Sequence, residues 1–140
     1  MRFMILVKAN ADSEAGKLPS ADELTEMTRF NEQLAKAGIM MAGEGLRDSS
    51  KGARVSFRGG KAKVIDGPFT ETKELIAGFW IWNVTSKDEA IEWVKRAPFK
   101  DGDIEIRQVF EDADFGANLT PETKAREERV RAEVSQKHAR

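Results

Sequence analysis

Charged side chains gather around a Gly-Pro pair in the middle of the chain, where they could carry acid–base chemistry. Asp66 precedes Gly67-Pro68, and Glu71 and Lys73 follow shortly after it. A carboxylate there could bind a polar ligand or deprotonate it, with Lys73 as charge partner. The alternative is structural, because Asp before Gly-Pro suits a tight turn and Glu71 could simply pair with Lys73. Asp66 and Glu71 are candidate catalytic residues, and Asp66 and Lys73 are candidate ligand contacts.

A third candidate carboxylate, Glu44, lies between two glycines in a segment with the pattern of a strand. A carboxylate that is buried in a sheet needs a partner, and Arg47 or Arg107 could supply one. Such a pair could line a cavity and anchor a polar ligand, or it could be a purely structural ion pair. Glu44 is therefore a candidate base and ligand contact, and Arg107 is a candidate ligand contact.

Two tryptophans offer a surface for a planar ligand. Trp80 and Trp82 are two residues apart in the most β-prone run of the chain, so they share one face of a strand. They could form an aromatic wall, or they could pack in the core or at an interface. Both are candidate ligand contacts.

Composition removes several classes of function. The chain has no cysteine, which excludes disulfides and thiolate nucleophiles, and its only histidine, His138, lies in a charged tail. Gly43 and Gly45 lack the helix and lysine of a phosphate-binding loop. We expect no cofactor and no metal, with a carboxylate-only Mg²⁺ site as the remaining alternative. The formal net charge of −1 gives no basic field for nucleic acid or an anionic membrane.

The first apolar run, residues 3–7, is too short for a signal sequence or a membrane span. We therefore expect a cytoplasmic protein of one domain with one core.

Hydrophobic periodicity predicts an α+β fold in the order β-α-β-β-β-β-α-β. Ser20 and Ser86 each precede a Glu by three residues, which is the capping-box pattern that begins a helix. Gly59-Gly60 separates two alternating segments and predicts a hairpin. We expect residues 3–7 to be a strand that is buried on both faces and residues 10–19 to be a loop. The other expected strands are residues 39–46, 53–58, 61–65, 78–85 and 103–111, and the expected helices are residues 21–37 and 86–97.

This order is a ferredoxin-like split βαβ unit with an inserted hairpin. The sheet should be mainly antiparallel, with both helices on one face. The other face carries aromatic and β-branched residues, and a second copy could cover it. We expect a homodimer, since a standard interface buries about 800 Å² per partner.

The stretch from Asp66 to Glu74, followed by Gly78-Phe79, resembles the signature of the DGPF branch of the YCII-related proteins. Supporting matches are residues 43–46 and 104–107. The resemblance covers residues 1–115 and leaves a charged helical tail at residues 116–140. It implies a fold of the dimeric α/β-barrel kind, and many members of the family have no established activity.

Some members of the wider YCII-related group carry a His on the first helix and an Asp after the second, which suggests an acid/base site. In this sequence Met27 or a neighbour occupies the first position, and Ala97-Pro98-Phe99 stands where that Asp would be. The resemblance therefore does not carry a His-dependent mechanism to this chain.

The tail begins with Thr120-Pro121, a favourable helix start, and continues with helix-forming residues to Lys137. Its apolar residues, Ala125, Val130 and Val134, form only a thin stripe. The helix could pack on a partner subunit or fray in solution.

Three functions remain as hypotheses. The first is a small-molecule-binding or regulatory homodimer. The second is a cofactor-independent enzyme of isomerase, lyase or oxygenase type that uses Asp66, Glu71 or Glu44 as base. The third is a protein-interaction module that docks through the tail. The lack of a suitable histidine or cysteine favours binding, because a carboxylate base at neutral pH needs a strongly raised pKa.

Overall fold

A computed structural model of the chain describes residues 1–139 and shows two compact units. The first unit, Met1–Val109, holds the sheet, its helices and the hairpin. The second begins at Phe110 and holds the last helix.

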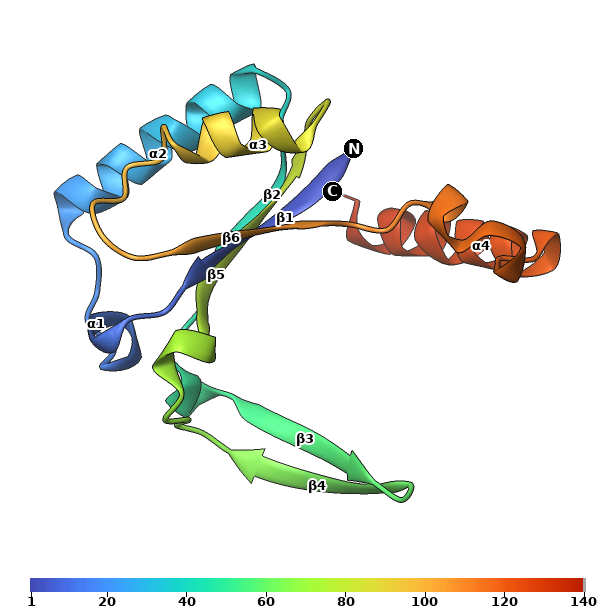
Figure 1. Cartoon of the computed structure of the whole chain (residues 1–140), viewed down its shortest axis with the longest axis horizontal. Helices are drawn as coiled ribbons and strands as arrows, with labels where there is room; N and C mark the ends of the chain where they lie inside the picture. The colour runs from blue at the N-terminus through green and yellow to red at the C-terminus, as the bar shows by residue number, and fades with distance from the viewer. Residues whose placement is uncertain (140) are drawn as a thin grey trace. The chain divides into compact units, whose positions relative to one another are not determined.

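The centre of the first unit is a four-stranded sheet in which every pairing is antiparallel (Figure 1). The strand order is β2-β5-β1-β6, so the first strand lies in the interior beside strands from the second half of the unit. The expected α+β class and antiparallel sheet are confirmed. The strands are β1 (Arg2–Lys8), β2 (Met40–Gly45), β5 (Ile76–Asn83) and β6 (Ile104–Gln108).

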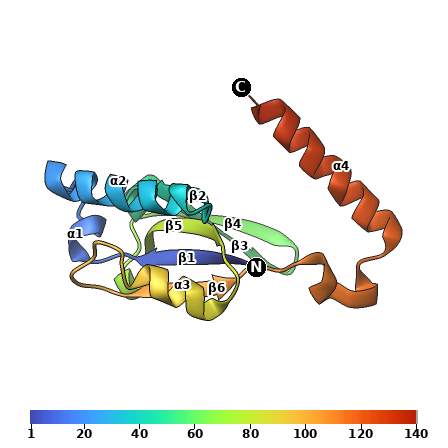
Figure 2. The same ribbon diagram turned by 90° about the horizontal axis from the view of Figure 1, so that it is seen from above.

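Both long helices of this unit cover one face of the sheet. Helix α2 (Ala21–Lys36) lies over β2 and β5, and α3 (Lys87–Val94) lies towards β6 (Figure 2). The Ser20 side chain accepts from the Glu23 N–H and Glu23 bonds back, as the capping box predicts. The buried core between these layers consists of Phe3, Ile5, Phe30, Leu34, Ile39, Trp80, Trp82, Val84 and Ala90.

No helix of the first unit covers the opposite face of the sheet, which we call the open face. Its centre is apolar: Met4 lies opposite Ile81, and Leu6 lies opposite Phe79. These four side chains are half-buried, whereas Phe3 and Ile5 on the helix side are buried. The expectation that residues 3–7 are buried on both faces is therefore wrong for the single chain, because the helices occupy one side only.

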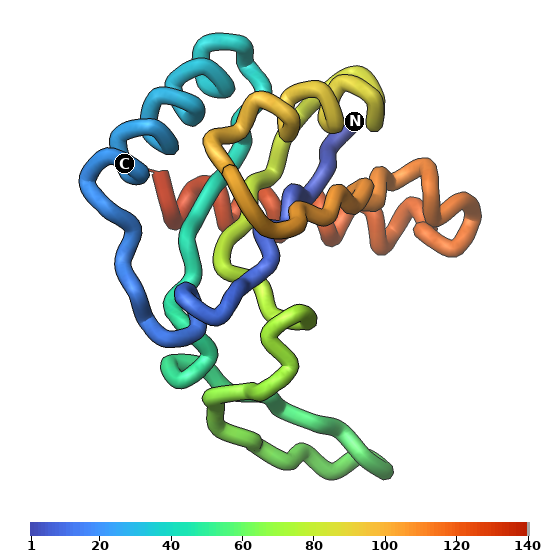
Figure 3. The backbone as a smooth tube through the Cα atoms, turned by 60° about the vertical axis from the view of Figure 1, so that its left-hand side comes forward, coloured from blue at the N-terminus to red at the C-terminus, as the bar shows by residue number. Residues whose placement is uncertain are grey.

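The inserted hairpin is confirmed as a separate two-stranded sheet, β3 (Ala53–Arg58) and β4 (Lys61–Asp66). Gly59 and Gly60 form its turn with φ of 57° and 79°, a backbone conformation that favours glycine. Figure 3 shows the hairpin extending beyond the end of the four-stranded sheet. We call residues 53–66 the arm.

Two local expectations need correction. Residues 10–19 contain a short helix, α1 (Ala11–Glu14), because Asn10 and Ser13 cap each other reciprocally. Before α3, Ser86 caps the helix, but the Glu89 carboxylate accepts from the N–H and hydroxyl of Thr85 instead of closing the box on Ser86.

The second unit contains η3 (Asp112–Asn118), two short 3-10 pieces joined by a kink at Gly116. The helix α4 (Pro121–His138) follows and runs without a break (Figure 2). Thr120 accepts from the Thr123 N–H at the helix start, as expected. Val130 and Val134 are exposed, and α4 buries no residue. Within residues 1–139, no helix combines the length and apolarity that crossing a membrane requires.

Candidate functional site

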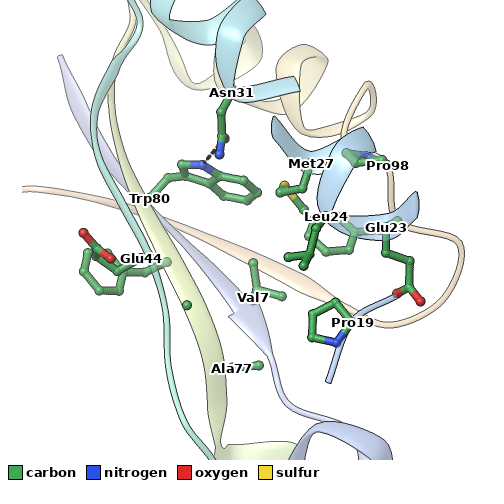
Figure 4. Close-up of a pocket in the computed structure, with 14 residues that line it drawn as sticks. Val7, Pro19, Glu23, Leu24, Met27, Asn31, Glu44, Ala77, Trp80 and Pro98 are labelled. Carbon is green, nitrogen blue, oxygen red and sulfur yellow. Dashed lines mark hydrogen bonds between the residues drawn. The ribbon is translucent and has the colours of Figure 1, made fainter. Parts of the chain in front are cut away.

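An apolar cavity of about 420 Å³ lies between the helix face of the sheet and the first half of α2. Val7 and Trp80 form its floor and Leu24 and Met27 its α2 wall (Figure 4). The segment after α3 contributes Phe99 to the lining. Cavities of this size can hold a single ring with substituents. We call it the helix-side pocket.

The aromatic wall of this pocket is Trp80, which is 5% exposed. Its ring meets Phe99 edge to face at 6.2 Å and Phe30 at 5.8 Å. On its other side lies Gly43, where a Cβ atom would stand 2.6 Å from Trp80 Cδ1. The indole can therefore lie against β2 only because residue 43 is a glycine.

A hydrogen bond fixes the orientation of this wall. Trp80 Nε1–H donates to Asn31 Oδ1 at 2.9 Å (Figure 4). An indole nitrogen can only donate, so the carbonyl end of the Asn31 amide must face it. Within residues 1–139 the NH₂ end of Asn31 has no recorded partner. Since Asn31 is half-buried and lines the pocket, two N–H groups remain available to a ligand.

The rim of the pocket carries one carboxylate. Glu23 lies beside Pro19 at the mouth (Figure 4), is exposed, and accepts from the Ser20 N–H at 3.4 Å. A second, polar cavity of about 670 Å³ adjoins the mouth and shares Val7, Glu23, Ala77, Pro98 and Phe99 with the pocket. The cleft is thus apolar inside and polar at its entrance.

Glu44 contributes to the pocket only through its position on β2. Its carboxylate lies on the far side of the strands from Val7 and Trp80 (Figure 4), because a bulge in β2 shifts the register so that Gly43 pairs with Trp80 and Glu44 with Phe79. Glu44 is exposed. The expected buried pair with Arg47 or Arg107 is therefore wrong: Arg107 lies on the other edge strand and bonds Glu105 at 3.2 Å.

The charged residues around the Gly-Pro pair lie outside the pocket, at the base of the arm. Asp66 ends β4, and Lys73 lies in the 3-10 helix η2 (Thr72–Glu74). Glu71 pairs with Arg54 at 3.4 Å, not with Lys73. The guanidinium of Arg54 also lies 3.8 Å above the ring of Phe69.

The segment Gly67–Phe69 joins the arm to the 3-10 turn η1 (Ser49–Lys51). Gly67 N–H donates to Gly52 O at 3.1 Å, and Phe69 N–H donates to Ser49 Oγ at 2.9 Å. A Cβ atom at Gly67 would stand 1.8 Å from Ser49 O. The structural interpretation of this motif therefore gains support, since its backbone packing requires glycine.

Of the two tryptophans, Trp80 lines the pocket and Trp82 lies in the core with no exposed surface. Their shared face is confirmed. Sequence reasoning missed Asn31, although a signal was present: Asn31 interrupts the apolar stripe Leu24, Met27, Leu34 at helical spacing.

Among the carboxylates of the described residues, Asp48 and Glu89 have a shifted pKa, and neither lines the pocket. Hydrogen bonds from the Ser50 hydroxyl to Asp48, and from the Thr85 hydroxyl and N–H to Glu89, hold both pKa values below their ordinary range. In the part of the chain that the structure describes, no three Asp, Glu or His side chains are grouped as metal ligands.

Comparison with known proteins finds a family model that spans most of the chain. A sequence model of the YCII-related domain matches residues 1–112. An uncharacterised protein of Rhizobium meliloti (strain 1021) is 28% identical over an alignment of 89 residues, and the match covers 61% of this chain and 72% of that protein. The solved structure of 5-chloro-2-hydroxyhydroquinone dehydrochlorinase from Burkholderia phenoliruptrix AC1100, in complex with 2,5-dihydroxybenzoquinone, aligns with a TM-score of 0.45 and 18% identity. That alignment covers 81% of this chain and 98% of that one.

Proposed function

The chain belongs to the YCII-related family, and we propose that it is a homodimer whose helix-side pocket binds a small planar molecule. The ligand that fits is mostly apolar and carries a hydrogen-bond acceptor, such as a carbonyl oxygen, on its ring. The observation that carries this proposal is the Trp80–Asn31 hydrogen bond, which holds an aromatic wall and leaves an amide donor beside an apolar cavity.

The chemistry of the lining supports binding over turnover. The carboxylate at the mouth, Glu23, is exposed and engaged in a helix cap. Asp66 and Glu71 lie at the base of the arm, and the Glu44 carboxylate lies on the open face. An acid–base step on a molecule in this pocket would need a titratable group close to it, whereas the residues nearest to Trp80 offer an amide and apolar surface.

The open face supports the proposed homodimer. Met4, Leu6, Phe79 and Ile81 present half-buried apolar surface on the side without helices. Covering such surface stabilises an assembly by about 25 cal/mol per Å² before association costs. A second copy of the chain supplies an equally apolar face.

Fragment binding tests the ligand proposal. Planar aromatic fragments that carry a carbonyl oxygen should quench or shift the tryptophan fluorescence and raise the melting temperature. Replacing Asn31→Leu removes a hydrogen bond worth about 1 kcal/mol, so affinity should fall about 5- to 10-fold. Gln33→Leu, an exposed position on the same helix, should leave affinity unchanged.

Two results would contradict the proposal: no fragment binds the wild type, or the Asn31 and Gln33 variants bind equally well. Chromatography of the bound fragment after incubation would reveal any turnover. Light scattering at micromolar concentration tests the homodimer independently, because a monomer mass would contradict it while leaving fragment binding intact.

A further inference from the structure

The arm has no core of its own. Its two strands pair only with each other, and an isolated two-stranded hairpin is marginally stable in water. Yet four large apolar side chains lie on it in water: Val55, Phe57, Val64 and Ile65 are 52%, 69%, 64% and 40% exposed. The arm therefore carries apolar surface that its own chain leaves uncovered.

Most of this apolar surface lies on one side of the arm, which holds the three most exposed of these residues. Val55 lies opposite Val64, and Phe57 lies opposite Ala62, so these four residues share a face. The other face carries the pairs Arg54 with Ile65, Ser56 with Lys63 and Arg58 with Lys61, so Ile65 is its one large apolar residue. The pattern is that of a strand pair with one face packed and the other in water.

The base of the arm is held firmly although its tip is unsupported. Gly67 and Phe69 bond to the segment around Ser49, and the Ser49 N–H and hydroxyl donate to the Glu14 carboxylate. Arg54 stacks on Phe69 and pairs with Glu71. Anchoring an element before it binds reduces the entropy cost of association.

Charge indicates what covers the apolar side. Residues 53–66 contain four cationic side chains and one anionic side chain, Asp66, which gives the arm a charge of +3. The cations are Arg54, Arg58, Lys61 and Lys63. Since the whole chain carries −1, the rest of it carries −4. Two arms would repel each other, whereas an arm and the remainder of another copy attract.

Area points to the same occupant. A four-stranded sheet about 15 Å wide and 20 Å long offers a face of about 300 Å², well short of the roughly 800 Å² per partner in a stable interface. Each copy also buries its own arm face, about 200 Å², and a similar area that receives the partner's arm. Added to the sheet face, these bring the contact to about 700 Å² per copy.

We propose that the arm packs against a second copy of this chain. The Val55–Phe57–Val64 side of the arm contacts that copy on a surface outside the second copy's own residues 53–66. The inference rests on the homodimer of the proposed function and adds the element that completes its interface. The cationic side of the arm stays in water, and its long side chains reach the acidic remainder of the partner.

Paired variants on neighbouring residues test the arm directly. Phe57→Ser with Val64→Thr removes the apolar side, and Ser56→Thr with Ile65→Thr changes the opposite side of the same strands. The dimer dissociation constant, measured by analytical ultracentrifugation, should rise at least tenfold in the first variant and less than twofold in the second. An unchanged constant in the first variant would overturn the arm contact and leave the homodimer standing. A monomeric wild type would overturn both, while fragment binding at Asn31 is measured separately.

Cross-linking keeps the proposal testable if the double variant does not fold. The chain has no cysteine, so Phe57→Cys provides a single thiol for a photo-activated cross-linker. In dimers mixed from ¹⁴N- and ¹⁵N-labelled chains, the links should join differently labelled chains and end outside residues 53–66. Links confined to one chain, or running from arm to arm, would refute the contact.

Discussion

Trp80 and Trp82 are the same residue type on the same face of the same strand, yet they lie in opposite surroundings. Trp82 has no exposed surface and packs in the core with Phe30, Leu34 and Ala90, which we call the closed half. Trp80 borders the pocket beside Leu24, Met27 and Asn31, which we call the open half.

The difference comes from the helix above them. The second half of α2 places Phe30 and Leu34 on the sheet, and both are buried. The first half places Met27 and Leu24 there, and Leu24 is 55% exposed. A pocket therefore forms where the helix does not bury its apolar side chains against the sheet, and on the strand Gly78, which shares the face of Trp80, adds no side chain to fill the space there.

Alanine substitutions of the two tryptophans should give the largest difference in stability between the closed half and the open half. Trp82→Ala should lower the free energy of unfolding by about 3–5 kcal/mol, because it leaves a closed cavity in the core. Trp80→Ala should cost less, since part of that ring already borders an empty pocket. Urea denaturation of both variants measures the difference. Equal losses would mean that the pocket is filled by packing in solution.

Gly43→Ala should disturb the packing around Trp80 in the open half and leave the packing of the closed half unchanged. Its Cβ would stand 2.6 Å from Trp80 Cδ1 and 2.8 Å from Met40 Cε, and relieving such overpacking costs about 1–3 kcal/mol. Gly45→Ala is the matched control for stability, because nothing lies within 4 Å of a Cβ at that position. The free energy of unfolding should fall in the first variant only, and fragment affinity should fall in Gly43→Ala relative to the wild type. A Gly43→Ala protein that binds fragments normally would show that Trp80 does not form the wall.

Replacing each of the two tryptophans with phenylalanine should reverse the order of the stability losses expected for alanine. Trp80→Phe removes the bond to Asn31 and leaves that carbonyl unpaired, at a polar cost of about 1 kcal/mol. Trp82 Nε1 is buried and has no hydrogen-bond partner among the described residues, so Trp82→Phe removes an unsatisfied donor. The polar loss should therefore be smaller at Trp82. Unfolding free energies of the two variants, compared with their alanine counterparts, measure it.

The smallest expected effect is a pH dependence of the free energy of unfolding. It arises at the start of α3, the helix that supplies Ala90 to the closed half. The hydrogen bonds from Thr85 lower the pKa of Glu89 below its ordinary value of 4.5. The stabilisation is therefore complete above pH 4.5 and is lost as the pH falls through the lowered pKa. In Glu89→Gln this part of the acid dependence should disappear, and Glu92→Gln serves as an exposed control on the same helix. Unfolding titrations between pH 3 and pH 7 measure it, and identical profiles for Glu89→Gln and the wild type would contradict the assignment.

Much of this fold could be predicted from local patterns. The Ser20–Glu23 capping box, the Gly59-Gly60 turn and the alternation through Trp80 and Trp82 each depend on neighbouring residues, and the structure confirms them. These features are local, so the sequence carries them directly.

The candidate site was less predictable because one bulge decides it. With an uninterrupted period of two, Met40 and Glu44 would share a face. The register shift between Met40 and Ala42 places Gly43 against Trp80 and turns Glu44 to the open face. Gly43 and Gly45 indicate a bulge or a close backbone approach in this strand, but they do not fix where the register shifts. Asn31 acquires its role only through contact with a strand that lies far away in the sequence.

The position of β1 inside the sheet has a consequence for how the chain folds. Its neighbours are residues 76–83 and 104–108, so the first strand made cannot complete its pairing until more than half of the chain exists. Closing such distant contacts is slow compared with forming the helices. Pulse-labelled hydrogen exchange during refolding should therefore find the amides of α2 protected before those of β1, and simultaneous protection would contradict this order. Until then the apolar stretch Phe3–Val7 has two unpaired edges, and that interval is when the chain is most exposed to aggregation.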